Sequence, residues 1–285
     1  MDLIYRYNPQ EPFKPTAPDS AAVAMDELRR GNQRFAEIVK RMQECALTGE
    51  SGAPLVIPVG PISLGLPIVP GGAPLQSPYA LVVGCSDARA PVEAIFDQSF
   101  NSLFIVRVAG NVLGTECLGS IEYAVRNLRE NLRLIVVLGH TECGAVTAAV
   151  DSYVSPEASF DIAHTYTLRS LVDRIQLAVR GASKALRETV GDGVWLRPGY
   201  RTALRDMAVY MNAAVTAFDL QREIRNHNDS PLEVVDSVYD LATVRVRANL
   251  DEPSTTFAPA PRSADDFITL GQSLAASAEI ARVLG

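Results

Sequence analysis

The chain has 285 residues, of which 47% are hydrophobic and 21% are charged, so it can bury a sizeable core and is not a disordered polymer. Its formal net charge of −7 argues against a general nucleic-acid-binding protein, because such a protein needs a basic face to neutralise phosphates. The four cysteines are too few for a disulfide scaffold and are expected to be free thiols or metal ligands.

The N-terminal part of the chain is expected to be irregular apart from one helix. Residues 1–18 are rich in proline, whereas residues 20–41 place apolar side chains at helical spacing, so residues 1–48 are predicted to form an arm and a helix. Residues 49–78 are rich in glycine and proline without a usable period, which predicts a long packed loop or a lid.

The sequence carries no signal for export or for a membrane span. No basic segment followed by an apolar run opens the chain, and no window reaches the roughly 18 uninterrupted apolar residues that a spanning helix requires. We therefore expect a cytoplasmic protein.

From residue 79 onward, strand patterns alternate with helical patterns. Short apolar runs that suit buried parallel strands lie at residues 79–84, 102–108, 132–139 and 232–246. Helical spacing is found at residues 120–132, 142–150, 165–190, 200–226 and 263–283. This alternation predicts an α/β core over residues 79–250, with a mostly parallel sheet of about four parallel strands plus an edge strand, flanked by helices. Residues 251–285 are expected to form a linker and a C-terminal helical extension.

Soft metal ligands stand at the ends of two predicted strands. Cys85 follows the first run, and His140 and Cys143 follow the third at a spacing that lets both side chains reach one ion. Functional side chains of open parallel sheets gather at the carboxyl ends of the strands, so we expect the three to converge. Two thiolates and one imidazole favour zinc, and three protein ligands leave a fourth position open, as in catalytic zinc sites.

Asp87 and Arg89 lie two and four residues after Cys85. A carboxylate this close to a metal either ligates it or accepts a hydrogen bond from water on it, and a bidentate arginine can choose between these roles. The other interpretation is an ordinary surface ion pair of little energetic value. Beside a candidate metal, the sequence favours the functional interpretation.

These motifs resemble the signature of β-class carbonic anhydrases, in which Cys85-Ser-Asp87-Ala-Arg89 is followed about 55 residues later by His140-Thr-Glu-Cys143-Gly144. Segments that are similar to other parts of that family lie at residues 27–35, 104–111, 119–125 and 238–243. The resemblance covers roughly residues 20–48 and 76–250. It implies that Cys85, His140 and Cys143 are zinc ligands, that Asp87 and Arg89 are the catalytic pair, and that the protein is a homodimer or larger oligomer.

The resemblance also implies a substrate pocket at the dimer interface. Its implied residues are Gln76, Phe104, Ala109, Tyr123 and Gly144. The glutamine and the three wall residues would come from the neighbouring subunit, and Gly144 would offer a backbone N–H at a helix start. Val82 stands where the subgroup inhibited by bicarbonate carries tryptophan, so we expect the plant-type, uninhibited arrangement.

The activity that the resemblance implies is the reversible hydration of carbon dioxide to bicarbonate and a proton by zinc-bound hydroxide. Two alternatives stay open: a hydrolase of carbon disulfide or carbonyl sulfide on the same zinc motif, and a catalytically silent structural or regulatory homologue. Residues 49–75 and 251–285 exceed the usual length of the family, and either segment can reshape the entrance or the oligomer. We expect the terminal helix to pack against another subunit.

Overall fold

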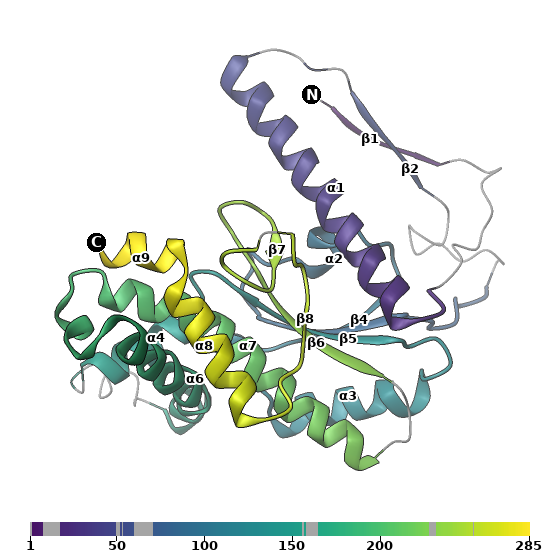
Figure 1. The fold of residues 1–285 in the computed structure, drawn as a ribbon. Coiled ribbons are helices and arrows are strands. Elements are labelled where there is room, and N and C mark those ends of the chain that lie inside the picture. Colours follow the sequence, from purple (N-terminus) through teal and green to yellow (C-terminus); the bar gives the residue numbers. More distant parts are fainter. Residues whose placement is uncertain are drawn as a thin grey trace.

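The computed structural model of the chain describes residues 2–7, 18–49, 52, 54–59, 71–155, 157, 165–227, 232–252 and 254–285. Within these residues, the centre of the molecule is a six-stranded sheet in the order β4-β3-β5-β6-β7, with β8 beside β6 (Figure 1). Its strands are β3 (Ala80–Gly84), β4 (Leu103–Arg107), β5 (Leu134–His140), β6 (Glu233–Tyr239), β7 (Val246–Arg247) and β8 (Ala258–Pro259).

The four long strands of this sheet run parallel to one another, and the short β7 and β8 pair with β6 in antiparallel fashion. The structure therefore confirms the predicted α/β fold with a mostly parallel sheet. Since β3 and β5 are parallel neighbours, with Gly84 opposite Leu138, their carboxyl ends open on the same edge. That edge is where the sequence placed its candidate ligands.

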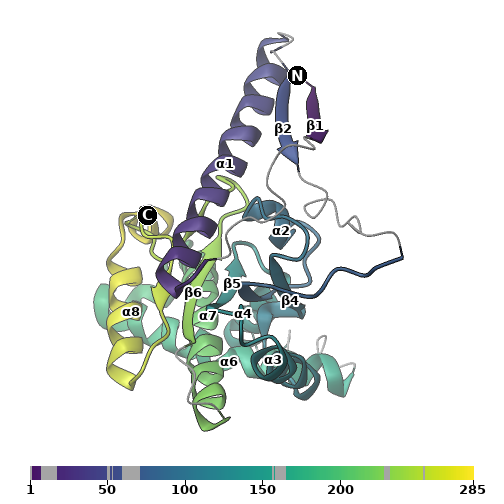
Figure 2. The ribbon, with the colours of Figure 1, turned by 90° about the vertical axis from the view of Figure 1, so that its right-hand side faces the viewer.

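Helices cover both faces of the sheet (Figure 2). Alternate residues of β3 serve different cores: Leu81 and Val83 belong to the large core on one face, and Ala80 and Val82 belong to the smaller core on the other. The helices and single turns of the chain between the N-terminal region and β6 are α2 (Val92–Ile95), η2 (Ala109–Asn111), α3 (Thr115–Asn127), α4 (Gly144–Val154), α6 (Tyr166–Val190), η3 (Asp192–Leu196) and α7 (Tyr200–His227). Residues of α3, α4, α6 and α7 line the large core, and residues of α1 (Ala21–Thr48) line the smaller one.

The N-terminal region corrects the expectation of an irregular arm and of a patternless insertion. β1 (Leu3–Tyr7) pairs in parallel with β2 (Leu55–Val59), which lies inside the predicted loop 49–78. A parallel pair needs a long connection between its strands, and the 28-residue helix α1 supplies it. Residues 8–17 and 60–70 of the same predictions lie outside the described part of the chain.

The C-terminal extension is two helices rather than one, and it packs on its own chain. α8 (Ala264–Ala276) and α9 (Ala278–Leu284) are separated by Ser277, whose hydroxyl caps the second helix by accepting from the amide of Ile280. The extension lies against α6 and α7 (Figure 1). The expected contact of this helix with another subunit stays a prediction beside these contacts within the chain. Among the described residues, no helix has the length and apolar character needed to cross a membrane.

Candidate metal centre

The three predicted ligands converge at the carboxyl edge of the sheet. Cys85 directly follows β3, His140 ends β5, and Cys143 is the N-cap residue of α4. Their ligand atoms all lie within 4.8 Å of one another, and all three side chains are buried. Convergence follows from the parallel pairing of β3 and β5, which brings residues about 55 positions apart in sequence to one point.

A tight turn lets His140 and Cys143 face the same point. Between them, Glu142 adopts a positive φ of 56°, and the amide of Thr141 donates to the carbonyl of Tyr239 at 2.9 Å. The Nδ1 atom of His140 lies 2.9 Å from the carbonyl oxygen of Thr141, which orients the ring. Its Nε2 atom is buried and has no hydrogen-bond partner among the described residues. An orphaned imidazole nitrogen beside two thiols fits a metal ion.

The two sulfur atoms form a strongly interacting pair. The Sγ atoms of Cys85 and Cys143 lie 3.9 Å apart, within hydrogen-bonding distance for sulfur. The hydrogen bond from Cys143 lowers the pKa of Cys85 below its usual range, against the opposing effect of burial. The same hydrogen bond together with burial raises the pKa of Cys143 far above its usual range. Thiolates rather than thiols bind metal ions, so the lowered pKa of Cys85 suits a metal ligand.

Asp87 is held beside the ligands rather than among them. Its two carboxylate oxygens accept from Nε and Nη2 of Arg89 at 3.0 and 2.8 Å, and one of them also accepts from the backbone amide of Arg89 at 2.8 Å. Arg89 hydrogen bonding holds the pKa of Asp87 well below its usual range. Oδ2 of Asp87 lies 3.9 Å from Nε2 of His140. The carboxylate thus stays charged and close to the ligand cluster while its oxygens are engaged by the guanidinium.

Further residues, which the sequence did not assign, fix this arrangement. Arg107 donates to the carbonyl oxygens of Cys85 and Asp87, at 2.9 and 2.5 Å, and so holds the loop that carries both. Glu142 accepts from Arg89 through its backbone carbonyl at 3.3 Å, and its carboxylate lies 3.5 Å from the guanidinium. Sequence spacing gave no signal for these contacts, because each joins segments that the fold brings together from different strands.

Gly110 is the most informative of the unassigned residues. Its backbone N–H donates to Sγ of Cys85 at 3.3 Å, and its carbonyl accepts from the side-chain amide of Asn212 at 2.8 Å. Its φ of 67° lies in the left-handed region, and a Cβ atom there would sit 2.9 Å from Cδ1 of Ile175. Glycine is therefore required both by the backbone conformation and by the space. The one sequence signal was a glycine in the turn after a predicted strand.

The predicted pocket residues divide into two groups: Gly144 and Ala109 are neighbours in sequence of residues of the metal centre, whereas Phe104, Tyr123 and Gln76 are not. Gly144 is the first residue of α4 beside Cys143, and Ala109 begins η2 next to Gly110. Phe104 and Tyr123 pack against each other with ring centroids 6.5 Å apart, and the Tyr123 side chain is 52% exposed. Gln76 is exposed in the segment before β3, and no hydrogen bond of the described residues joins it to the Cys–His–Cys group. The structure thus brings the ligands, Asp87 and Arg89 together and leaves Gln76 and Tyr123 facing solvent in the single chain.

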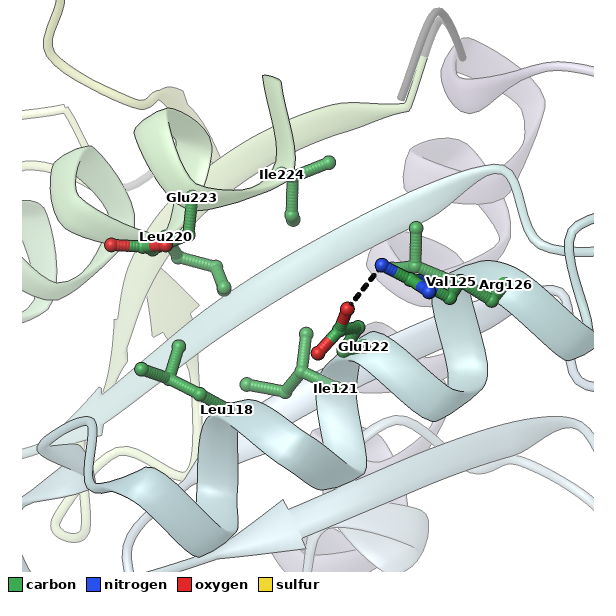
Figure 3. A pocket seen from close by; sticks show the side chains of 8 residues that line it. All are labelled: Leu118, Ile121, Glu122, Val125, Arg126, Leu220, Glu223 and Ile224. Atoms are coloured by element: carbon green, nitrogen blue, oxygen red, sulfur yellow. Dashed lines mark ion pairs between the residues drawn. The ribbon is translucent and has the colours of Figure 1, made fainter. Parts of the chain in front are cut away.

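Two hollows in the described part of the chain lie away from the candidate ligands. A small apolar cavity of about 60 Å³ lies between α3 and α7, where Leu118 and Ile121 face Leu220 and Ile224 (Figure 3). A larger hollow of about 450 Å³ shares Leu118 with it and includes Asn212. Neither hollow is lined by a candidate ligand, so the chemistry of the metal centre depends on the strand ends and not on these cavities.

Comparison with known proteins identifies one family. Residues 80–246 match the sequence profile of the family described as "Carbonic anhydrase", which is more than half of the chain. The chain is 55% identical over 75 residues to "Carbonic anhydrase 2" of Mycobacterium tuberculosis, covering 26% of this chain and 35% of that protein. It is 41% identical over 110 residues to "Carbonic anhydrase" of Mycolicibacterium smegmatis, covering 39% of this chain and 50% of that protein. The alignments therefore span half or less of the length of these curated relatives.

Solved structures of low sequence identity also match. A β-carbonic anhydrase of Aspergillus fumigatus has 20% identity and a TM-score of 0.47, with 85% of this chain and 96% of that chain covered. A tetrameric β-carbonic anhydrase of Sordaria macrospora has 20% identity and a TM-score of 0.46, with 61% of this chain and 81% of that chain covered.

Proposed function

The chain belongs to the carbonic anhydrase family, and from this premise we propose that it catalyses the reversible hydration of carbon dioxide to bicarbonate and a proton. The observation that carries the proposal is the buried group of Cys85, His140 and Cys143, with ligand atoms within 4.8 Å of one another and an orphaned Nε2 on the histidine. Two sulfurs and one nitrogen are a donor set typical of catalytic zinc with one open position.

The proposed roles of the chain's own residues follow from this donor set. Cys85, His140 and Cys143 would hold Zn²⁺, which when bound supplies Lewis acidity and makes a water molecule nucleophilic near neutral pH. Asp87 accepts a hydrogen bond from the attacking water and turns a lone pair toward the carbon of carbon dioxide. Because Arg89 keeps the pKa of Asp87 well below its usual range, Asp87 acts as an acceptor and not as a proton donor.

The ion pair between Asp87 and Arg89 also bears on the fourth ligand position. Arg89 engages both carboxylate oxygens, at 3.0 and 2.8 Å, and such a bidentate pair opposes movement of Asp87 onto the metal. This geometry would keep Asp87 out of the ligand set of a bound zinc ion. The protein would then be active without a rearrangement of its ligands.

We further propose that two copies of the chain complete each active site. We also propose that the protein is cytoplasmic. Gln76, Phe104 and Tyr123 would then wall the pocket of the partner subunit, together with Ala109, and Gly144 would present its N–H to the anion from within. The exposure of Gln76 and of half of Tyr123 in the single chain supports this arrangement. The plant-type arrangement without bicarbonate inhibition belongs to the same proposal.

The test is a stopped-flow carbon dioxide hydration assay on the purified protein, with zinc measured by plasma emission. We expect about one zinc per chain and a rate that is lost with the metal in Cys143→Ala. Cys45→Ala is the matched control, because Cys45 lies on α1 outside the ligand group and should retain both metal and rate. Full zinc content in Cys143→Ala would contradict the ligand assignment. A zinc-loaded protein that hydrolyses carbonyl sulfide but does not hydrate carbon dioxide would contradict the proposed reaction.

A further inference from the structure

A buried ionic network joins the last helix of the chain to the end of β6. The guanidinium of Arg247 donates to Oδ2 of Asp240 at 2.9 Å and to the two carboxylate oxygens of Glu279 at 3.0 and 3.2 Å. The Arg247 and Asp240 side chains are only 12% and 10% exposed, and that of Glu279 is 30% exposed. Because Arg247 and Asp240 are largely removed from water, removing one of these two partners would leave a poorly solvated charge, and this pair should cost more to break than a surface pair does.

The Asp240 end of the network reaches the turn that carries two of the candidate ligands. Oδ1 of Asp240 accepts from the amides of Ala242 and Thr243, at 2.9 and 3.2 Å, which fixes the turn after β6. Within that turn, the amide of Leu241 donates to Oγ1 of Thr141 at 3.0 Å. Thr141 lies between His140 and Cys143, and its carbonyl oxygen orients the His140 ring. A route therefore runs from Glu279 to the ligand turn through polar contacts and, between Asp240 and Leu241, through the peptide bond.

The position of Glu279 is fixed by the packing of α9 against the rest of the chain. Glu279 lies in the first turn of α9, where the amide of Ala278 donates to Oδ1 of Asp251 at 3.2 Å. At the far end of α9, a Cβ atom on Gly199 would lie 1.8 Å from the carbonyl oxygen of Val283, so α9 approaches the start of α7 as closely as glycine allows. The position of α9, and with it that of Glu279, is set by packing at both ends.

We propose that Glu279 is a positioning residue for the metal centre: through Arg247 and Asp240, the C-terminal helix braces the turn of residues 140–143. This inference rests on the proposed function, because it takes His140 and Cys143 as zinc ligands. Glu279 lies beyond residues 80–246, the part of the chain that matches the family profile. The extension is thus a working part of the site and not an appendage.

The experiment compares zinc release from the parent protein and from Glu279→Gln, measured as transfer to a chromophoric chelator at constant pH. The variant should release zinc about tenfold faster, with an unchanged far-ultraviolet circular dichroism spectrum. Cobalt-substituted Glu279→Gln should show altered visible bands, because these report the geometry of the metal ligands. Glu188→Gln is the matched control, since it removes a comparable carboxylate from a surface pair with Lys184 on α6.

Two further variants separate the proposed route from a general loss of stability. Gly199→Ala should displace α9, and Glu279 with it, while leaving the three ionic side chains unaltered in chemistry, and it should also speed zinc release. In a Thr141→Val background, which lacks the hydroxyl that Leu241 contacts, Glu279→Gln should have little additional effect.

The outcomes are distinguishable. Release from Glu279→Gln at the parent rate, or an equal acceleration with and without Thr141→Val, overturns the inference alone. A zinc-loaded parent without hydration activity overturns the proposed reaction but leaves the brace intact. A parent that binds no zinc overturns both.

Discussion

The carboxyl group of Asp87 is held in a fixed position, and its pKa lies well below the usual range. Both come from Arg89, whose guanidinium and amide engage the two carboxylate oxygens. We therefore expect Asp87→Ala to retain zinc, because Asp87 is not in the ligand set, but to hydrate carbon dioxide roughly 100-fold or more slowly. Parallel measurements of zinc content and steady-state hydration rate test this. Asp97→Asn, which weakens a remote pair with Arg34, should change neither.

Asp236 carries a second perturbed carboxyl, in the middle of β6. Burial alone raises its pKa from 3.8 to about 8. A carboxyl with a raised pKa in the folded state binds a proton there that the unfolded chain has already lost. Stability should therefore fall as the pH rises from about 4 to about 8 and change no further, as far as Asp236 is concerned.

Asp236→Asn removes this dependence, since an amide does not ionise. The variant should gain stability over the parent progressively between pH 5 and pH 9, by several kcal/mol at the alkaline end. Urea denaturation of the zinc-loaded proteins at several pH values measures the difference. Curves that stay parallel over this range would show that Asp236 ionises freely in the folded protein.

The residue scale is also where sequence and structure agree best. Cys85, His140 and Cys143 could be predicted because they lie at the carboxyl ends of buried strands. Parallel strands place these ends at the same edge of the sheet. Arg107 and Asn212 could not be assigned, because their roles depend on carbonyl groups of distant loops. The sequence specifies which side chains are present, whereas the position of a backbone acceptor is known only from the folded structure.

At the scale of single elements, the short turn η2 supplies a hydrogen-bond donor to Cys85 from its backbone, where a side chain would otherwise be needed. It directs the amide of Gly110 at the sulfur of Cys85, and the turn fits only because residue 110 lacks a side chain. Gly110→Ala would place a Cβ atom 2.9 Å from Ile175 and 3.0 Å from Ala145 at a φ of 67°.

We expect Gly110→Ala to destabilise the protein by about 2–3 kcal/mol, combining the cost of a positive φ with that of overpacking, and to weaken zinc retention. Thermal unfolding and zinc content measure the two effects. Gly119→Ala is the control, because a Cβ atom on this helical residue meets nothing within 4 Å and alanine favours helices by about 1 kcal/mol. A Gly110→Ala protein as stable as Gly119→Ala would show that η2 can shift at no cost.

The strand pair β1–β2 shows where element prediction failed. Residues 55–59 contain Pro58, and proline within a short apolar run argues against a central strand. β2 pairs only with β1 in the described part of the chain, and β1 lies 48 residues or more earlier in the sequence. Neither strand has a period long enough to be recognised alone. The alanine-rich pattern of residues 263–283 likewise predicts one continuous helix. In the structure, Ser277 divides this segment into two helices, and the helical spacing of apolar residues gives no sign of the break.

At the scale of the whole molecule, the proposed dimer makes a direct prediction. Phe104 and Tyr123 form an aromatic pair at the surface near the edge strand β4, and Tyr123 is half exposed. If this pair walls the partner's pocket, Tyr123→Arg should shift the protein toward monomers and reduce hydration activity together. Sedimentation velocity and the hydration assay, carried out at the same protein concentrations, measure both. Tyr166→Arg is the control, because Tyr166 is 75% exposed on α6.

A monomeric parent protein with full activity would contradict the shared-site proposal.

The fold of one chain could be predicted from its strand and helix patterns, since each depends on local spacing and on burial on both faces. The assembly could be inferred only from resemblance. Periodicity distinguishes buried from exposed side chains, but it does not tell which exposed side chains another subunit covers.

The pairing of β3 with β5 has a consequence for folding. Any ion held by Cys85 and His140 ties together two points of the chain that are 55 residues apart, with β4 and α3 in the loop between them. Such a tie acts on the unfolded chain as a disulfide does, because closing a loop of that length removes conformational entropy that the open chain would retain. The metal would then cross-link the chain at the carboxyl edge of the sheet, and its removal by a chelator should lower the midpoint of unfolding as well as the rate of the reaction.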